Sequence, residues 1–401
     1  MGNIRRGENV RKVLITGVSG FVGSYLANEL LTLHNDEVWG MYRKRTTGEV
    51  PENIRKRVPP GPRFHSVEGD MSDYETLSTI IADINPDVIF HLAAQAYVPR
   101  SMSNPDETFR TNVKGTHNLL EAARNYANNP VIVFAGSSEE YGKVMLDAKP
   151  SELPINEDNP LRPQSPYAVS KVAGDFMMRS YHDVYGMKTV VSRAFNHEGP
   201  GRGRMYVTTA ICDQVVRGGA ISLGNVRAFR DWSHVRDIVR GYIILSHLGK
   251  FGEIYVQGSG RTNSVLTYAL LAFNRFYKKE INEISCGDLT IENPLEVDEG
   301  EWEFGNRLLM LNNVDYSILA DTSETGKPCK GIFGFNDGSI AIKMEDGVKR
   351  HIFFDADKWR PVDVPILFSD PSKMMELGFE VHYELEDIVT EQVYHAQTQP
   401  A

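Results

Sequence analysis

Residues 12–23 read KVLITGVSGFVG, and this stretch decides the fold. A short apolar run leads into three spaced glycines, and an amphipathic stretch follows. Gly17 can adopt a turn conformation that residues with a side chain disfavour. Gly20 lets the backbone approach a pyrophosphate, and Gly23 lets the next helix pack closely on the strand. The N-terminus of that helix then faces the anion. The stretch predicts a strand-turn-helix unit that binds a dinucleotide.

Similar apolar runs recur through the first half of the chain. They lie at residues 12–15, 37–41, 88–92, 131–134 and 189–192. Between them, apolar residues spaced by three and four predict crossover helices. Strands that are apolar on both faces are typical of parallel sheets, so the pattern predicts an α/β fold with a Rossmann-type doubly wound parallel sheet.

The pattern changes in the second half, which predicts a smaller, interleaved C-terminal substrate lobe. Residues 1–195 are expected to form the cofactor-binding domain, with a return segment near 232–258, and residues 196–401 the substrate-binding lobe. Alternating runs and the turns at 336–338 and 345–347 predict a β-hairpin-rich insertion at about 283–357.

Composition excludes several classes of protein. The 401 residues carry 43 Lys and Arg against 53 Asp and Glu, a net charge of −10, which disfavours a nucleic-acid partner. No run approaches the roughly 18 apolar residues of a membrane span, and the polar start lacks the apolar centre of a signal peptide, so a cytoplasmic protein is expected. No metal is expected either, because neither the cysteines nor the histidines show metal-ligand spacing. These residues are Cys212, Cys286, Cys329, His91, His197 and His234.

A basic stretch indicates the cofactor. Residues 42–45 read YRKR where an acidic residue would bind the ribose of NAD, which favours NADP, although a solvated basic loop is the alternative. Asp70 and Met71 are expected beside the adenine, and residues 92–95 beside the pyrophosphate and nicotinamide. The predicted cofactor-binding residues are Gly17, Ser19, Gly20, Phe21, Val22, Gly23, Arg43, Asp70, Met71, Leu92, Ala93, Ala94, Gln95, Tyr167, Lys171, His197 and Arg202.

Tyr167 and Lys171 lie one helical turn apart and project from the same face of a predicted helix. A tyrosine of pKa near 10 is a poor base at neutral pH, but a neighbouring ammonium and an oxidised nicotinamide both favour its phenolate. Ser137 follows the run at 131–134, at the strand end where ligands bind in such sheets. It can hydrogen-bond the substrate hydroxyl that Tyr167 deprotonates.

These motifs resemble the extended short-chain dehydrogenase/reductase superfamily and, within it, the nucleotide-sugar 4,6-dehydratases, most closely the GDP-mannose branch. The resemblance covers most of residues 11–280 and about 357–395. It rests on the glycine turn, the HLAAQ stretch at 91–95, the Tyr-Lys pair, SSE at 137–139, NHEGP at 196–200 and RPVD at 360–363.

The resemblance implies catalytic roles for Ser137, Glu139, Tyr167 and Lys171. Tyr167 would remove the proton from the hydroxyl on the fourth carbon of the sugar while hydride passes to NADP. Glu139 would then take the proton from the fifth carbon, water would leave the sixth, and the hydride would return there. Ser138 stands where dTDP-glucose dehydratases carry an acid, so Glu139 itself is one candidate to protonate the leaving hydroxyl. Adjacent Glu140 is a rival for the role of base, and strand alternation predicts that only one of the two faces the site.

The resemblance also implies a GDP-sugar substrate, with GDP-mannose converted to GDP-4-keto-6-deoxymannose. Its expected contacts are Asn196, Val207, Asn225, Arg230, Arg360 and Asp363. Asp363 and Gly201 replace what are often Glu and Arg, which bears on base identity and subunit contacts. A homodimer or homotetramer is expected.

Three alternatives remain open at this point. A GDP-heptose dehydratase would share nearly every motif. A GDP-4-keto-6-deoxyhexose reductase would share the Tyr-Lys pair but would not need Glu139. A non-catalytic NADP-binding sensor would not need the catalytic residues at all.

Overall fold

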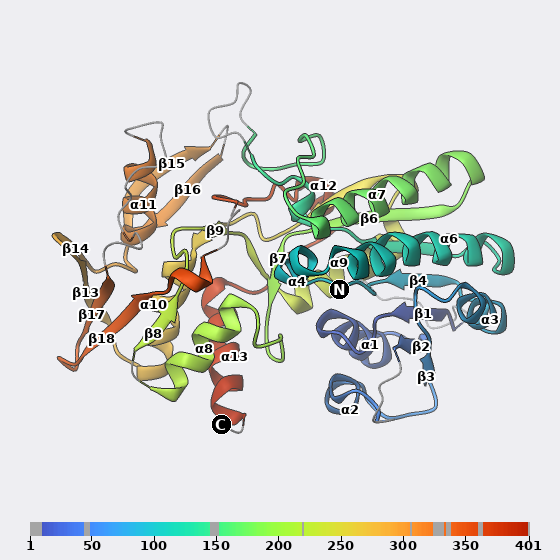
Figure 1. Ribbon diagram of the computed structural model, residues 1–401, viewed down its shortest axis with the longest axis horizontal. Coiled ribbons are helices and arrows are strands. Elements are labelled where there is room, and N and C mark those ends of the chain that lie inside the picture. Colours follow the sequence, from blue (N-terminus) through green and yellow to red (C-terminus); the bar gives the residue numbers. More distant parts are fainter. Residues whose placement is uncertain are drawn as a thin grey trace.

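A seven-stranded parallel sheet forms the core of the first domain in the computed structural model (Figure 1), which describes residues 10–43, 49–144, 152–218, 220–304, 307–323, 333, 338–359 and 364–399. Its order is β11-β6-β5-β4-β1-β2-β3, which confirms the predicted Rossmann-type fold. The strands are β1 (Lys12–Thr16), β2 (Glu37–Tyr42), β3 (Phe64–Glu68), β4 (Val88–His91), β5 (Val131–Ala135), β6 (Lys188–Ala194) and β11 (Ile254–Gln257).

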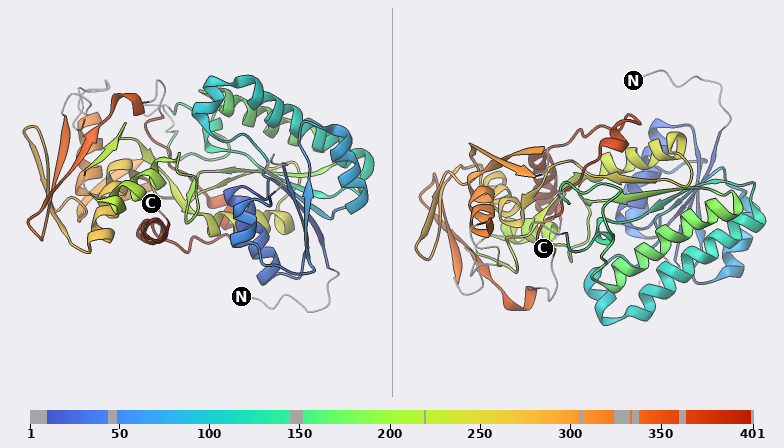
Figure 2. Two further views of the ribbon diagram at one scale, coloured as in Figure 1. Left: turned by 60° about the horizontal axis from the view of Figure 1, so that its bottom comes forward. Right: turned by 90° about the horizontal axis from the view of Figure 1, so that it is seen from above.

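Helices cover both faces of this sheet, as Figure 2 shows. One layer comprises α1 (Phe21–Leu33), α2 (Glu52–Arg57) and α9 (Val235–Leu248); the other comprises α3 (Tyr74–Ile84), α6 (Gly115–Tyr126) and α7 (Pro166–Tyr185). Each layer buries its own apolar cluster against the sheet. Short helices α4 (Val98–Ser103) and α5 (Pro105–Phe109) and a π-helical turn η1 (Arg110–Lys114) join β4 to α6.

The second lobe contains the largest apolar cluster and lies to the left in Figure 1. Its helices are α8 (Val207–Arg217), α10 (Val265–Tyr277) and α13 (Leu385–Thr398), which pack on one another. Short strand pairs connect it to the first domain: β7 (Asn196–Glu198) with β10 (Trp232–His234), and β9 (Phe229–Arg230) with β12 (Asn263–Ser264). Segment 235–257 leaves this lobe again and supplies α9 and β11 to the first domain.

The remaining elements build a second, smaller sheet in the order β14-β13-β17-β18-β8. Its strands are β8 (Ile221–Leu223), β13 (Ile281–Cys286), β14 (Leu289–Glu292), β17 (Ser339–Met344) and β18 (Lys349–Phe354). The hairpin β15 (Val297–Phe304) and β16 (Arg307–Asn312), α11 (Asn313–Ser323) and α12 (Ser372–Met375) complete the described α-helices and β-strands. Of the two predicted turns, 345–347 joins β17 to β18, whereas residues 336 and 337 lie outside the described residues.

Candidate active site

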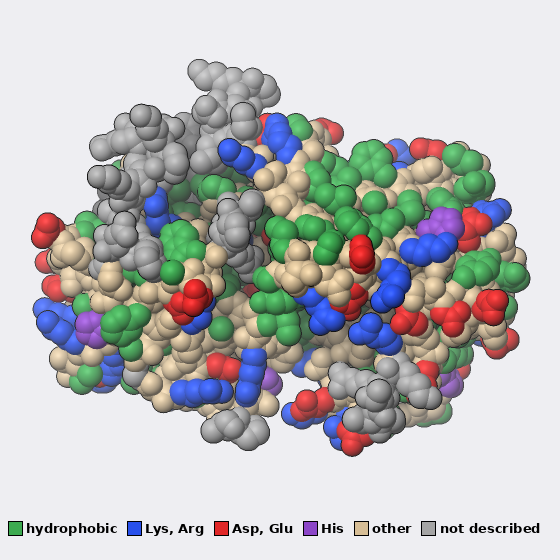
Figure 3. All heavy atoms as spheres, in the orientation of Figure 1, with side chains coloured by type: hydrophobic (Ala, Val, Ile, Leu, Met, Phe, Trp, Pro, Cys, Tyr) green, Lys and Arg blue, Asp and Glu red, His purple; other side chains and the backbone are tan. Residues whose placement is uncertain are grey.

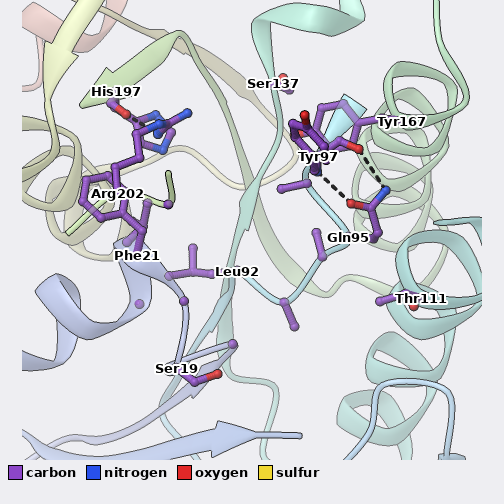
Figure 4. Close-up of a pocket in the computed structure, with 18 of the residues that line it drawn as sticks. Ser19, Phe21, Leu92, Gln95, Tyr97, Thr111, Ser137, Tyr167, His197 and Arg202 are labelled. Carbon is purple, nitrogen blue, oxygen red and sulfur yellow. Dashed lines mark hydrogen bonds between the residues drawn. The ribbon is translucent and has the colours of Figure 1, made fainter. Parts of the chain in front are cut away.

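A cleft of about 760 Å³ opens at the carboxyl ends of the sheet strands, between the two lobes. Figure 4 shows Ser137, Tyr97 and Tyr167 gathered at one end, with Arg202 and His197 across from them. Most of the predicted site residues line this one cleft. They are Gly17, Ser19, Gly20, Phe21, Val22, Gly23, Arg43, Asp70, Met71, Leu92, Ala93, Ala94, Gln95, Ser137, Glu139, Tyr167, Asn196, His197 and Arg202.

The glycine turn lies at the floor of the cleft. Gly17 has φ +79°, and a Cβ there would fall 2.9 Å from the backbone of Ala93. A Cβ on Gly23 would fall 2.5 Å from the Gly17 carbonyl oxygen. Helix α1 begins directly after Gly20 without a side-chain cap among the described residues, so the N–H groups of its first turn are available to a phosphate. These features fit a dinucleotide.

Asp70 and Arg43 line the end of the cleft that is predicted to bind adenosine. Asp70 Oδ1 accepts hydrogen bonds from Ser72, at 2.8 Å from its N and 2.7 Å from its Oγ. Partial burial alone would raise the pKa of Asp70, but these bonds and the charges of Arg43 and Arg110 hold it below its usual value. Arg43 lies at the cleft, whereas residues 44 and 45 of the basic stretch lie outside the described residues.

A buried amide ties the cofactor loop to helix α7. The Gln95 N–H donates to Asn112 Oδ1 at 2.8 Å, and Asn112 Nδ2 donates to the Gln95 carbonyl at 3.1 Å and to Ser170 Oγ at 2.9 Å. Ser170 lies between Tyr167 and Lys171, so Asn112 fixes the loop relative to both residues. Sequence reasoning missed Asn112, because its partners come together only in the folded chain.

Tyr167 lies in the first turn of α7, where Ser165 caps the helix by accepting from the Ala168 N–H. Burial raises the pKa of its phenol, while a hydrogen bond with Ser137 acts in the opposite direction. Lys171 lies behind the cleft wall: its Nζ donates to the Ala135 carbonyl at 2.6 Å and is 5.9 Å from the centre of the Tyr167 ring. Burial lowers the pKa of Lys171 to about 8, and the charge of Glu140 opposes this shift.

The adjacent carboxyls Glu139 and Glu140 take different positions. They belong to a 3-10 turn, η2 (Ser138–Glu140), rather than to a strand, so strand alternation is the wrong reason for their separation. Glu139 lines the cleft. Glu140 is fully buried, accepts the Ser137 N–H at 2.7 Å and lies 3.5 Å from the Arg193 guanidinium. Burial and the charge of Asp175 raise the pKa of Glu140 to about 8.

The opposite wall comes from the segment after β6. The side-chain Oδ1 of Asn196 is buried and has no hydrogen-bond partner among the described residues. Arg202 donates to the His197 carbonyl and lies 3.0 Å from Glu198 Oε2. Burial, with the charge of Arg202, lowers the pKa of His197 to about 4, so this histidine is neutral near pH 7.

The other predicted substrate residues are placed elsewhere. Val207 is the exposed first residue of α8. Arg230 donates to the carbonyls of Phe229 and Val364 at 2.8 and 2.7 Å, and neither Arg230 nor Asn225 is part of the cleft lining. Arg360 and Asp363 lie outside the described residues.

Two tyrosines at the catalytic end escaped the sequence analysis. Tyr97 and Tyr206 both line the cleft, and their rings meet edge to face with centres 6.0 Å apart. Tyr97 precedes α4 in the first domain and Tyr206 precedes α8 in the second lobe. Because only the docking of the lobes brings them together, no local spacing could have indicated the pair.

Within the described ranges, no group of three or more His, Cys, Asp and Glu side chains is arranged to hold a metal ion. His91 is buried between the hydroxyls of Thr16 and Thr116, each 2.9 Å from a ring nitrogen, and burial lowers its pKa to about 3. None of the described helices is long and apolar enough to cross a membrane.

Solved structures share the fold over nearly the whole chain. The structure of RMD from Pseudomonas aeruginosa complexed with NADPH matches with a TM-score of 0.65 at 20% identity and covers 97% of this chain and 99% of that chain. That of dTDP-glucose 4,6-dehydratase from Bacillus anthracis in complex with NAD matches with a TM-score of 0.69 at 20% identity and covers 96% of both chains. The fold, the glycine turn and the Tyr167–Lys171 pair define an extended short-chain dehydrogenase/reductase.

The family follows from sequence comparison. The family model "GDP-mannose 4,6 dehydratase" matches residues 14–299. GDP-mannose 4,6-dehydratase of Yersinia enterocolitica is 34% identical over 401 aligned residues, which cover 96% of this chain and 93% of the relative. The chain belongs to the GDP-mannose 4,6-dehydratase family.

Proposed function

We propose that this protein is a GDP-mannose 4,6-dehydratase that forms GDP-4-keto-6-deoxymannose without net consumption of NADP. The observation that carries the proposal is one cleft that combines the glycine turn with Ser137, Glu139 and Tyr167. Family membership supports the choice of substrate.

The cofactor site would hold NADP at the first turn of α1, with Arg43 at the adenosine end. Bound there, NADP supplies a hydride acceptor that later returns the hydride. The basic side chain of Arg43 supports NADP over NAD. A phosphate on the ribose would pair well with a guanidinium.

The first chemical task falls to Tyr167. Its phenolate removes the proton from the hydroxyl on the fourth carbon, and Ser137 holds that hydroxyl by a hydrogen bond. Because burial raises the pKa of Tyr167, the phenolate needs a compensating positive charge, which buried Lys171 provides when protonated. The resulting ketone acidifies the hydrogen on the fifth carbon.

Glu139 performs the second task by removing that hydrogen as a proton. It is the carboxyl of the adjacent pair that lines the cleft, whereas Glu140 lies behind it in the protein interior. A positioned acid or base of this kind typically contributes about 10²–10⁴ in rate. Loss of the hydroxyl on the sixth carbon then gives an enone, which accepts the returning hydride.

An assay with a sugar panel tests the proposal. Purified protein is incubated with NADP and GDP-mannose, a GDP-heptose, or CDP-, UDP- or dTDP-sugars, and the products are weighed by mass spectrometry. We expect GDP-mannose to lose one water with no lasting change in NADPH absorbance. Preference for the GDP-heptose would reassign the substrate, steady NADPH consumption on a 4-keto sugar would indicate the reductase, and binding without turnover would indicate the sensor.

We also propose that the active form is a homodimer or homotetramer in the cytoplasm. An exposed apolar stripe on α7, formed by Val169, Phe176 and Val184, supports self-association.

A further inference from the structure

The leaving hydroxyl needs a proton donor, and this question rests on the proposed function. Hydroxide is a poor leaving group, so its departure from the sixth carbon requires an acid in the cleft. Glu139 is occupied as the base for the fifth carbon. Ser138 also lines the cleft, but an unperturbed aliphatic hydroxyl is a far weaker acid than a carboxyl or a phenol.

Tyr206 is a phenol whose position suits this task. It lines the same cleft as Ser137, Glu139 and Tyr167. Its ring is held on two sides: the Arg202 guanidinium lies 4.0 Å from the ring centre, and the Tyr97 ring meets it edge to face. The phenol is therefore carried by a fixed ring at the catalytic end of the cleft.

Tyr206 also lies close enough to Tyr167 to affect the pKa of its phenol electrostatically. Negative charge on the Tyr206 phenol raises the pKa of Tyr167, so the two phenols disfavour being ionised together. The two phenols together therefore favour the state with one shared proton over the state in which both are ionised. The nearby Arg202 guanidinium favours the Tyr206 phenolate once its proton has left.

We propose that Tyr206 is the general acid that protonates the leaving hydroxyl on the sixth carbon of the sugar. As Glu139 removes the proton from the fifth carbon, the electron pair forms the double bond to the sixth. The bond from that carbon to oxygen breaks, and the oxygen leaves as water with the Tyr206 proton. Glu139 returns its proton to the fifth carbon when hydride reaches the sixth.

The proton balance of the cycle closes under this assignment. Tyr167 ends the cycle with the proton from the hydroxyl on the fourth carbon, and Tyr206 ends it one proton short. One proton transfer between these two neighbouring phenols restores both to their starting states. No further acid or base is required.

The test compares two substrates in the full-length protein loaded with NADP. Fluoride leaves without protonation, so GDP-6-deoxy-6-fluoromannose bypasses the general acid. In Tyr206→Phe, we expect turnover of GDP-mannose to fall by about 10²–10⁴ while fluoride release from the analogue falls less than about tenfold. Product mass and fluorine NMR measure the two reactions.

Tyr97→Phe is the matched control, because it alters the other phenol of the same ring pair. It should change both substrates by the same factor and leave their ratio at the wild-type value. Fluoride release by Tyr206→Phe also proves that the variant is folded and binds NADP.

Equal losses on both substrates in Tyr206→Phe, or no loss on GDP-mannose, would overturn the assignment. Those results leave the proposed function intact, because the wild-type protein still dehydrates GDP-mannose. The proposed function fails separately if the wild-type protein dehydrates none of the GDP-sugars, and the role of Tyr206 then fails with it.

Discussion

Adjacent residues Glu139 and Glu140 show how much position decides the role of a side chain. One carboxyl reaches the cleft, whereas the other is buried against Arg193 and holds the Ser137 backbone. Sequence spacing predicted the Tyr167–Lys171 pair because one helical turn separates them. It could not predict Tyr206 or Asn112, whose partners lie far away in the chain.

For Glu139→Gln, we expect hydride exchange between the cofactor and the fourth carbon to continue while water loss falls by about 10²–10⁴. The amide cannot remove the proton on the fifth carbon, but oxidation of the fourth carbon, in which Tyr167 is the base and NADP would be the hydride acceptor, does not need that step. Deuterium transfer from sugar labelled at the fourth carbon, read by mass spectrometry, measures the exchange.

Tyr167→Phe serves as the comparison and should lose both exchange and water loss. A Glu139→Gln variant that dehydrates the sugar at nearly the wild-type rate would exclude Glu139 as the base.

The buried carboxyl of Glu140 predicts a pH dependence of stability. Its pKa is raised from 4.5 to about 8, so the folded chain keeps a proton that the unfolded chain has released. The stabilisation that this bound proton gives the folded chain is fully present below the ordinary pKa of 4.5 and is lost as pH rises through about 8. Glu140→Gln keeps an acceptor for the Ser137 N–H and does not titrate. Between pH 5 and pH 8.5, its free energy of unfolding should therefore rise by roughly 1–3 kcal/mol relative to that of the wild type.

Urea unfolding at the two pH values measures this difference. Glu139→Gln, the same substitution at the adjacent carboxyl that lines the cleft, is the control. A Glu140→Gln variant that loses stability relative to the wild type as pH rises would contradict the prediction.

At the scale of elements, the loop between β7 and α8 is held by the first domain. The Pro200 carbonyl accepts from Tyr25 Oη at 2.9 Å and from Arg57 Nη2 at 3.0 Å, and Arg57 lies 4.2 Å from the centre of the Tyr25 ring. Thus α1 and α2, which flank the cofactor turn, also position the loop that carries Arg202.

A side chain at Gly201 in this loop should disturb the contact between the Pro200 carbonyl and Arg57. It has φ +84°, and a Cβ there would fall 2.2 Å from Arg57 Nη2. Gly186, with φ +66° and nothing within 4 Å of its Cβ position among the described residues, is a matched control. In urea unfolding we expect Gly186→Ala to cost about 1–2 kcal/mol from backbone strain alone and Gly201→Ala to cost more. Equal losses in the free energy of unfolding for the two variants would show that the loop and Arg57 rearrange at no cost.

Apolar runs predicted five of the seven strands, β1, β2, β4, β5 and β6, because burial on both faces leaves a plain pattern. They could not give the strand order or the π-helical turn at 110–114, since both depend on contacts between distant segments. The predicted substrate residues Asn225 and Arg230 came from motif resemblance alone, and the cleft lining does not include them.

At the scale of the molecule, the surface of α7 predicts assembly. Figure 3 shows hydrophobic side chains gathered over this helix. Phe176 of α7 is 53% exposed. Phe176→Glu should reduce the oligomer to a smaller species in light scattering, because a charge in a dimer interface costs several kcal/mol. Leu33→Glu, on α1 and 70% exposed, should leave the mass unchanged. An unchanged mass for Phe176→Glu would place the interface elsewhere.

The return of β11 to the main sheet has a consequence for synthesis on the ribosome. Strand β6, buried along most of its length, has no outer neighbour until residues 254–257 have emerged. Translation must therefore deliver α8 and the short connecting strands before the nucleotide-binding half can close its edge. A nascent chain that pauses near residue 195 presents an unpaired apolar edge, which is a substrate for chaperones and a seed for aggregation.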